Sequence, residues 1–544
     1  MLGFKATSYP LLVTSDRPTP TSIIRPNAAR ENTTKRSCSA AIPPVRVFGL
    51  KCLHGVDTML EEIPVELATQ IFHYAHADLP AISCASRKLH CLATPVLYAS
   101  ITLGSPGTAI LCCSTLARTP SENPRYNLPA LVRSFLILEF YGSHLLDKQK
   151  DKFLCSLCHA VEHMINLQRV AVKEYGLVTP RFWASITKYT GLKSLDIVIP
   201  HTNNYEMAQM EEVGFDKLRP GMPELVELRI NICIDRVLPE SYIALLQHLI
   251  TSHSDQLHAF SLKSDAWDPQ LFQTLLGPQN KFSSLETLTI PSGALNLECL
   301  RYMPKVHTLI VKEERMSRRA IKSMDSDFTL SLDTFPVLTT LTCPAYDLHA
   351  ILPRDTNRAV QTVCLDEAFF DIAPGLQDCA RLRSHSPEWT VVLDGLQYIP
   401  NSRGPVTDLS FRVEDLSLGR NLPSAIPFLG SVEKLMICHA LELSISEDNA
   451  SLRNDFFAQL PHLHTFIIGD SLMHSDDSEN WFMHAHDNTL QRYLLEEWDK
   501  GSKDGGGTGL KNAALSLRLW WTNVEGMWVE KWTPIEGEEE EEEE

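Results

Sequence analysis

A short apolar pattern that returns twelve times is the feature that most limits how this chain can fold. Each copy reads apolar-x-x-apolar-x-apolar, and successive copies start roughly 21 to 46 residues apart, with a mean of about 30. Alternate residues of a strand face the same side, so each copy predicts a short strand with one buried face. The copies begin at Val132, Leu167, Leu192, Leu225, Leu257, Leu285, Val306, Leu338, Val360, Val406 (the weakest), Val432 and Leu463.

This spacing is typical of leucine-rich repeats, in which a strand is followed by a return segment that is usually helical. One unit cannot bury its apolar edge, so stacked units are expected to form a solenoid with a continuous core. A proline stops the preceding helix at Pro223, Pro304, Pro336 and Pro461. The Asn or Cys turn residue of regular repeats is mostly missing, which predicts an irregular solenoid over 104–530. Ordinary α/β alternation in a compact enzyme is the alternative, and twelve copies of one pattern argue against it.

A different pattern occupies residues 59–103, just before the repeats. Ile63, Leu67 and Ile71 recur every four residues, with Phe72 beside them, and this spacing predicts one face of a helix. A second apolar stripe, interrupted at Pro95, leads into a strand-like run that ends at Leu103. The residues of that stripe are Ile82, Ala85, Leu89 and Leu92.

The order "IPVEL", "QIF" and "ADLPAISCASRKLHCLATPVLY" within 62–103 resembles an F-box, and the lead from "ATPVLYASITL" into repeats is similar to fungal F-box proteins with leucine-rich repeats. This resemblance implies a three-helix module that docks on the Skp-type adaptor of SCF cullin-RING ubiquitin ligases. The family more often has Leu at Ile63, a swap of similar volume. By match to the motif, the adaptor-facing or supporting residues are Ile63, Pro64, Leu67, Ile71, Phe72, Leu79 and Ile82.

The residues themselves favour docking too. A short helical module with more apolar side chains than it can bury presents a face that fits the groove of a partner. A plain helical cap for the solenoid is the alternative interpretation.

Charge and cysteine usage narrow the choice of partner and compartment. The chain of 544 residues has a formal net charge of −18, of which the run Glu538–Glu544 supplies seven. An acidic surface repels phosphate, so neither nucleic acid nor an anionic membrane is expected as a partner. The 14 cysteines show no framework spacing and predict free thiols in the cytoplasm or nucleus. No apolar run approaches the roughly 20 residues that span a bilayer.

Composition also suggests the domain boundaries. Residues 1–58 are rich in Pro, Ser and Thr and are expected to be a disordered leader, although their composition overlaps with that of organellar transit peptides. The helical module spans 59–103 and the solenoid 104–530, with a Gly-rich linker or loop near 500–510. Terminal strands are expected to cap the solenoid before an acidic disordered tail at 531–544.

Several motifs that could carry chemistry have simpler explanations. Cys155, Cys158 and His159 spell the C-x-x-C-H of haem attachment, but they lie in a helical pattern without an export signal. His159 and His163 stand four residues apart, with no third metal ligand evident nearby. The run "GGGTGLKN" lacks the ending of a phosphate loop. We therefore expect a protein that is not an enzyme and holds no cofactor or metal.

Two sets of residues are candidates for binding a target. The residue between the last two apolar positions of each copy is expected to face out from the sheet, and these positions include Asp196, Arg229, Ser261 and Thr289. They are mixed and mostly uncharged; the others are Ala171, Ile310, Thr342, Cys364, Met436 and Ile467. A basic cluster of Lys312, Arg315, Arg318, Arg319 and Lys322 could clamp an acidic or phosphorylated peptide. A solvated helix is its simpler interpretation.

The sequence thus predicts an α/β fold, in which an F-box-like module precedes an irregular leucine-rich-repeat-like solenoid. The expected function is that of a substrate receptor: the module would dock the Skp-type adaptor, and through it a cullin-RING ligase, while the solenoid would hold an unknown protein target. A repeat scaffold without a ligase role is one alternative, and an enzyme with an unrecognised site is another.

Overall fold

The structure is a computed structural model, and the residues that it describes all belong to one compact unit, Leu60–Glu544. The expected leader at 1–58 lies outside them, as do 501–508 of the expected loop and all of the tail after Trp532, so these domain boundaries stay predictions. The described residues are 65–74, 79–122, 127–140, 147–174, 176–199, 222–232, 238, 240–264, 269–277, 280–312, 328–365, 388–413, 421–439, 452–470, 488–500, 509–516, 519–524 and 526–532.

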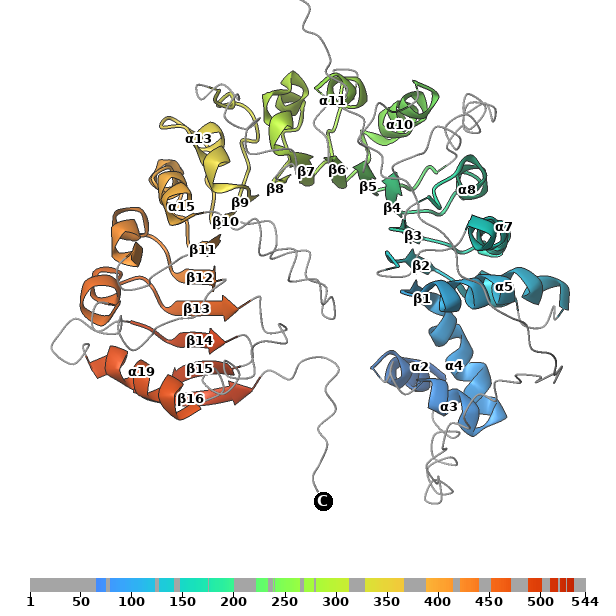
Figure 1. Ribbon diagram of the computed structural model, residues 1–544, viewed down its shortest axis with the longest axis horizontal. Helices are drawn as coiled ribbons and strands as arrows, with labels where there is room; N and C mark the ends of the chain where they lie inside the picture. The colour runs from blue at the N-terminus through green and yellow to red at the C-terminus, as the bar shows by residue number, and fades with distance from the viewer. Residues whose placement is uncertain are drawn as a thin grey trace, which may run out of the picture. The chain divides into compact units, whose positions relative to one another are not determined.

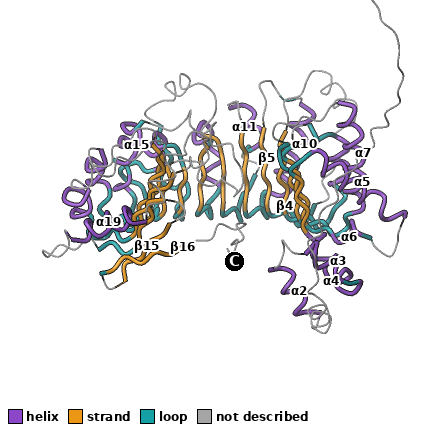
Figure 2. Tube along the Cα trace, turned by 60° about the horizontal axis from the view of Figure 1, so that its bottom comes forward, coloured by secondary structure: helices purple, strands orange, loops and turns teal. Residues whose placement is uncertain are grey.

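One sheet of 16 strands, paired in chain order, runs through the described part of this unit. Its strands are parallel from β1 to β14, and the last two are antiparallel. Figure 1 shows the strands side by side, with helices along one side of the sheet, and Figure 2 shows the same layering from another angle. The strands are β1 (Ser100–Leu103), β2 (Ser134–Ile137), β3 (Arg169–Val172), β4 (Ser194–Ile199), β5 (Glu227–Ile232), β6 (Ala259–Ser264), β7 (Thr287–Pro291), β8 (Thr308–Lys312), β9 (Thr340–Thr342), β10 (Thr362–Leu365), β11 (Asp408–Val413), β12 (Lys434–His439), β13 (Thr465–Asp470), β14 (Asn512–Ser516), β15 (Leu519–Val524) and β16 (Met527–Trp532).

The twelve copies of the apolar pattern coincide with the twelve strands β2–β13. All three apolar positions of every copy are buried, none of them more than 2% exposed. They join a single hydrophobic core that continues from Leu103 to Trp528. The solenoid-like repeat is confirmed at this level, because each strand buries the predicted face against the segment that returns from it.

Where the structure describes the return segments they are largely helical, as expected, but they change type along the chain. Among the described residues, most of the longer α-helices lie in the first half of the sheet and most of the short 3₁₀ turns in the second. The α-helices are α5 (Pro106–Glu122), α6 (Leu128–Leu131), α7 (Asp147–His163), α8 (Pro180–Ile186), α10 (Glu240–His253), α11 (Pro269–Leu275), α13 (Leu348–Ile351), α15 (Trp389–Leu396) and α19 (Asn488–Lys500). The shorter turns are η3 (Ser292–Asn296), η4 (Glu298–Tyr302), η5 (Ala345–Asp347), η8 (Ile399–Asn401), η9 (Leu422–Phe428), η10 (Leu452–Phe456, of π type) and η11 (Phe457–Gln459).

A backbone pattern at the start of each strand takes the place of the missing Asn ladder. The carbonyl of His307, for example, accepts the N–H groups of Thr339 and Thr340 from the next unit, both at 2.9 Å. The strand register has no shift from β1 to β13, so the irregularity of these repeats lies in the return segments. The same double acceptance recurs at twelve carbonyls: Arg133, Gln168, Lys193, Val226, His258, Glu286, His307, Thr339, Gln361, Thr407, Glu433 and His464.

The prolines before the strands have a more specific role than stopping a helix. Leu225 N–H donates to the Met222 carbonyl at 3.2 Å, across Pro223, and the same i to i+3 bond recurs at the other three sites. Proline is favoured at the second position of such a turn because its fixed φ matches the turn. At these four sites, the turn places the first apolar residue of the copy in the core.

In the described part of the chain, three helices precede the sheet: α2 (Val65–Tyr74), α3 (Leu79–Ala85) and α4 (Arg87–Ala99). They have a small core of their own, distinct from that of the solenoid, and α4 leads directly into β1. Its residues are Ala68, Phe72, Leu79, Leu89, Ala93 and Val96, with Ile82, Leu92 and Leu97 packed against them.

The expected break at Pro95 is wrong, because α4 continues through it to Ala99. Pro95 is exposed, so its ring meets no core side chain. Buried Ala93 and Val96 hold the flanking turns in place, and Ser86 caps the start of α4 by accepting the Leu89 N–H at 3.2 Å.

Candidate interaction surfaces

Helix α2 presents two large apolar side chains to solvent. Leu67 is 52% exposed and Ile71 is 40% exposed, and they lie one turn apart on the same face. Their chain neighbours Ala68 and Phe72 point the other way, into the core of the three-helix module. We call Leu67 and Ile71 the docking pair.

The other expected adaptor residues do not join this exposed face. Phe72 and Leu79 are fully buried and hold the module together, and Ile82 is partly buried against the same core. Ile63 and Pro64 lie outside the described residues. The described part of the motif therefore divides into two exposed side chains, Leu67 and Ile71, and a supporting core.

The outward-facing positions expected from the repeats form one row across the sheet. Asp196 pairs with Arg229, Arg229 with Ser261, and Ser261 with Thr289, on strands β4 to β7. We call the face that carries this row the inner face, since the helices lie on the opposite side of the sheet (Figure 1). Arg229 is exposed and Asp196 half-buried, whereas Ser261 and Thr289 are 8% and 6% exposed. The four residues are therefore neighbours in one row, but Ser261 and Thr289 offer little surface, and their role in target binding stays a prediction.

Residues two positions before and after this row share the same face, and the sequence reasoning missed them. Period two along a strand is the signal that would have found them. They bring four more charged side chains to the row: Arg169 and Lys173 at β3, Glu227 on β5 and Lys263 on β6. We define the charged patch as Arg169, Lys173, Asp196, Glu227, Arg229 and Lys263.

Within the charged patch, each carboxylate lies beside a cation. Lys173 Nζ is 3.9 Å from Asp196 Oδ2, and Arg229 Nη2 is 2.5 Å from Glu227 Oε1. Burial raises the pKa of the Asp196 carboxyl, and the nearby charges of Lys173, Arg229 and Lys263 oppose that rise only in part. The cost of desolvating the Asp196 carboxylate therefore exceeds the stabilisation that the three nearby cations give it, so ionised Asp196 destabilises the folded state.

This imbalance predicts how an Asp196→Asn variant behaves. The folded pKa lies above the unfolded one, so the contribution of Asp196 to stability is present at low pH and is lost as pH rises through the folded pKa. At about pH 7 the variant is expected to melt at the same temperature as the wild type or higher, and the difference should shrink toward pH 4. Thermal melts across that range check it, with exposed Asp333→Asn as the control. A clear drop in melting temperature at pH 7 would contradict the prediction.

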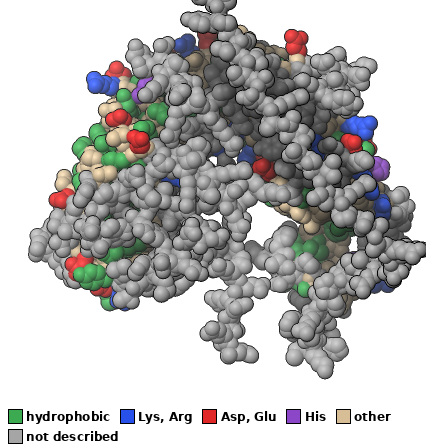
Figure 3. Space-filling model, viewed as in Figure 1, with side chains coloured by type: hydrophobic (Ala, Val, Ile, Leu, Met, Phe, Trp, Pro, Cys, Tyr) green, Lys and Arg blue, Asp and Glu red, His purple; other side chains and the backbone are tan. Residues whose placement is uncertain are grey.

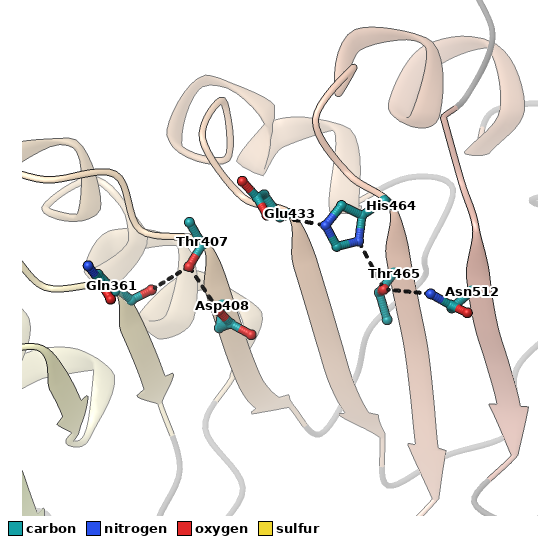
Figure 4. Close-up of polar contacts among 7 residues, drawn as sticks. All are labelled: Gln361, Thr407, Asp408, Glu433, His464, Thr465 and Asn512. Carbon is teal, nitrogen blue, oxygen red and sulfur yellow. Dashed lines mark hydrogen bonds and ion pairs between the residues drawn. The ribbon is translucent and has the colours of Figure 1, made fainter.

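The side chains that precede the strands form a second polar row at the edge of the sheet. Figure 4 shows part of it: the Thr407 hydroxyl donates to the Gln361 carbonyl at 3.4 Å and to Asp408 Oδ2 at 2.8 Å. His464 Nε2 is 3.2 Å from Glu433 Oε2. Such exposed cross-strand pairs are each worth less than about 1 kcal/mol and support the register.

No group of three metal-ligating side chains is found in the described part of the chain. His258, Glu286 and His307 come nearest in the edge row, with His–Glu distances of 3.4 and 3.7 Å. His159 and His163 on α7 stack edge to face at 4.7 Å, and burial raises the pKa of the neighbouring Cys158 thiol to about 11. The C-x-x-C-H segment therefore lies within α7, with Cys158 half-buried and with Cys155 and His159 exposed.

Arg315, Arg318 and Arg319 of the basic cluster lie outside the described residues, so its interpretation stays a prediction. Lys312, the first residue of the cluster, is described: it ends β8 and is buried. Of the helices described, none is both long and apolar enough to cross a membrane. Charged side chains of both signs are scattered over the face shown in Figure 3.

Comparisons with known proteins add little to these surfaces. No protein-family model matches the chain, and no curated protein matches it either. Among solved structures it is similar to a chain of the Rad7 and Elc1 complex from yeast, with 12% sequence identity and a TM-score of 0.27 over 72% of this chain and 94% of that one. At this TM-score the likeness bears on neither family nor function. The resemblance to an F-box therefore rests on residues 62–103 alone.

Proposed function

We propose that this protein is the substrate receptor of an SCF-type cullin-RING ubiquitin ligase. The three-helix module docks the Skp-type adaptor, and the solenoid holds a target protein. The observation that carries the proposal is the docking pair: Leu67 and Ile71 are exposed on a helix whose opposite face closes a separate core. Exposed apolar side chains one turn apart are the usual anchors of a helix that binds in a groove.

The division of labour leaves the chemistry to other subunits. A receptor accelerates ubiquitin transfer by holding a lysine of the target near the charged conjugating enzyme, which is a proximity effect. The protein itself is proposed to be non-catalytic, without cofactor or metal, and to act in the cytoplasm or nucleus.

Adaptor binding by point variants tests the proposal. Leu67→Asp places a charge in the apolar contact and is expected to weaken binding of a purified Skp-type adaptor by about 30-fold or more, with the melting temperature unchanged. Leu111→Asp is the matched control, because Leu111 is 71% exposed on α5, outside the module. Phe72→Ala is expected to lose adaptor binding by unfolding the module.

Two outcomes would contradict the ligase role. One is that titration calorimetry detects no binding of the adaptor to the wild-type chain. The other is a Leu67→Asp chain that binds as tightly as the Leu111→Asp control. Either result would favour a repeat scaffold that binds proteins without a ligase.

A further inference from the structure

The charged patch differs in sign from the rest of the protein. It holds four cationic and two anionic side chains on four adjacent strands, β3 to β6, and their flanks, whereas the whole chain has a net charge of −18. Lys173 and Arg229 are 48% and 49% exposed, so their charged ends are accessible. Arg169 is exposed as well, and Lys263 is half-buried. A local surplus of positive charge on an acidic protein attracts anionic groups.

The carboxylates of the charged patch are placed to orient these cations. Asp196 lies between Lys173 on one side and Arg229 and Lys263 on the other, and it is itself only 16% exposed. Glu227 lies next to Arg229 on the same strand at 2.5 Å. Each carboxylate fixes a cation while leaving about half of it open to solvent, which lowers the entropy lost when a ligand binds.

We infer that the charged patch is the recognition site for an anionic segment of a protein target, in which carboxylate or phosphate side chains contact Lys173, Arg229 and Lys263. That the bound protein is also a substrate for ubiquitin transfer rests on the function proposed above. Adjacent strands are about 4.8 Å apart, so the distance from β3 to β6 is about 14 Å and matches four to five residues of an extended peptide.

A peptide fits the charged patch better than a nucleic acid does. A continuous phosphate backbone would meet Asp196 and Glu227 as well as the cations, and the acidic remainder of the chain would repel it. A short peptide can place a few acidic side chains against the cations and avoid both carboxylates. The other half of the inner face is less suited, because its row from β10 to β14 is Cys364, Ser410, Met436, Ile467 and Ala514. Within the described residues, the positions two before and after this row add only Asp408, Arg412 and Lys434 as charged residues, and Arg412 is buried.

Fluorescence anisotropy with labelled peptides tests the inference on the full-length chain. A 12-residue peptide rich in Glu, a phosphoserine version of it and a neutral Gln version separate carboxylate, phosphate and non-specific binding. Both anionic peptides are expected to bind, and about 0.3 M salt should weaken them strongly. Arg229→Gln and Lys263→Gln should each weaken binding about 5-fold, whereas Asp196→Asn should tighten it about 3-fold. Lys434→Gln, an exposed cation on β12 of the same face, should change nothing.

Several results would overturn the inference. The inference fails if the neutral peptide binds as tightly as the two anionic peptides, or if a single-stranded oligonucleotide binds more tightly than they do. It also fails if Lys434→Gln weakens peptide binding as much as Arg229→Gln does. Binding that appears only after Glu538–Glu544 is changed to Gln would make the chain's own tail the occupant. The Leu67→Asp chain should keep full peptide binding. If the wild type binds the peptides but not the adaptor, the ligase role fails while the charged patch stands as an anionic-peptide site.

Discussion

Replacing Arg358 with methionine is expected to lower the free energy of unfolding by about 3 to 5 kcal/mol. Arg358 is fully buried, and its guanidinium donates to the carbonyls of Thr334 at 2.9 Å, Ile351 at 2.6 Å and Ser331 at 2.6 Å. Nη1 also donates to Thr356 Oγ1 at 3.1 Å. One side chain thus donates to three carbonyls from the segments between β8 and β10, and methionine would remove this donor from all three, although the Ser331 carbonyl would keep the Thr334 N–H at 2.9 Å.

The cost falls on the partners that Arg358 leaves behind. Methionine fills a similar length of the site, so little of the expected loss comes from a cavity. Burial lowers the pKa of Arg358 to about 10, well below the usual value for a guanidinium, yet the group stays charged at neutral pH. A buried cation held by carbonyl oxygens has a specific geometry, and Arg358→Lys is expected to be nearly as destabilising because it cannot make the fork of bonds.

Chemical denaturation followed by tryptophan fluorescence would measure the change. Arg354→Met is the matched control: Arg354 is exposed four residues earlier in the same loop, and its replacement should cost less than about 0.5 kcal/mol. Equal effects of the two substitutions would show that the hydrogen bonds of Arg358 contribute nothing measurable to stability.

The strands and the core could be predicted from the sequence because the apolar pattern states both the period and the buried face. Leu195 and Ile197 bracket Asp196, and this alternation is enough to place Asp196 on the inner face. Neighbouring strands then align in the simplest register, which brings Asp196 beside Arg229 although 33 residues separate them. The pattern does not predict which apolar residues of α2 are buried. Leu67 and Phe72 both fit its apolar stripe, but only Phe72 packs into the core that α3 and α4 complete, and Leu67 stays exposed.

The contacts between charged side chains on the inner face, and the hydrogen bonds of buried Arg358, could not be predicted in the same way. The 3.9 Å contact between Lys173 and Asp196 depends on the register of two strands and on which side chains the fold leaves open. Arg358 gives no signal in the sequence, because its partners are backbone carbonyls, which every residue carries. The role of the basic cluster stays a prediction, because residues 313–327 lie outside the described part of the chain.

Replacing Trp498 with alanine is expected to cost about 3 to 5 kcal/mol and to act locally at the C-terminal end of the sheet. Trp498 lies on α19 and is 1% exposed, with its ring 5.0 Å from Phe457 and 6.1 Å from Phe466 on β13. The same helix holds the terminal hairpin, because Trp521 Nε1 on β15 donates to Gln491 Oε1 at 2.9 Å. Loss of the indole therefore loosens the helix that covers the last strands.

Hydrogen exchange read out by mass spectrometry separates a local effect from a global one. Units of a solenoid are stabilised mainly by their neighbours, so exchange should accelerate in β13–β16 and stay unchanged in β3–β8. Tyr493→Ala on the same helix is the control, since Tyr493 is 55% exposed and its loss leaves no cavity. Faster exchange along the whole sheet would mean that the capping helix stabilises every repeat, and that the solenoid unfolds as one cooperative unit and not from its end.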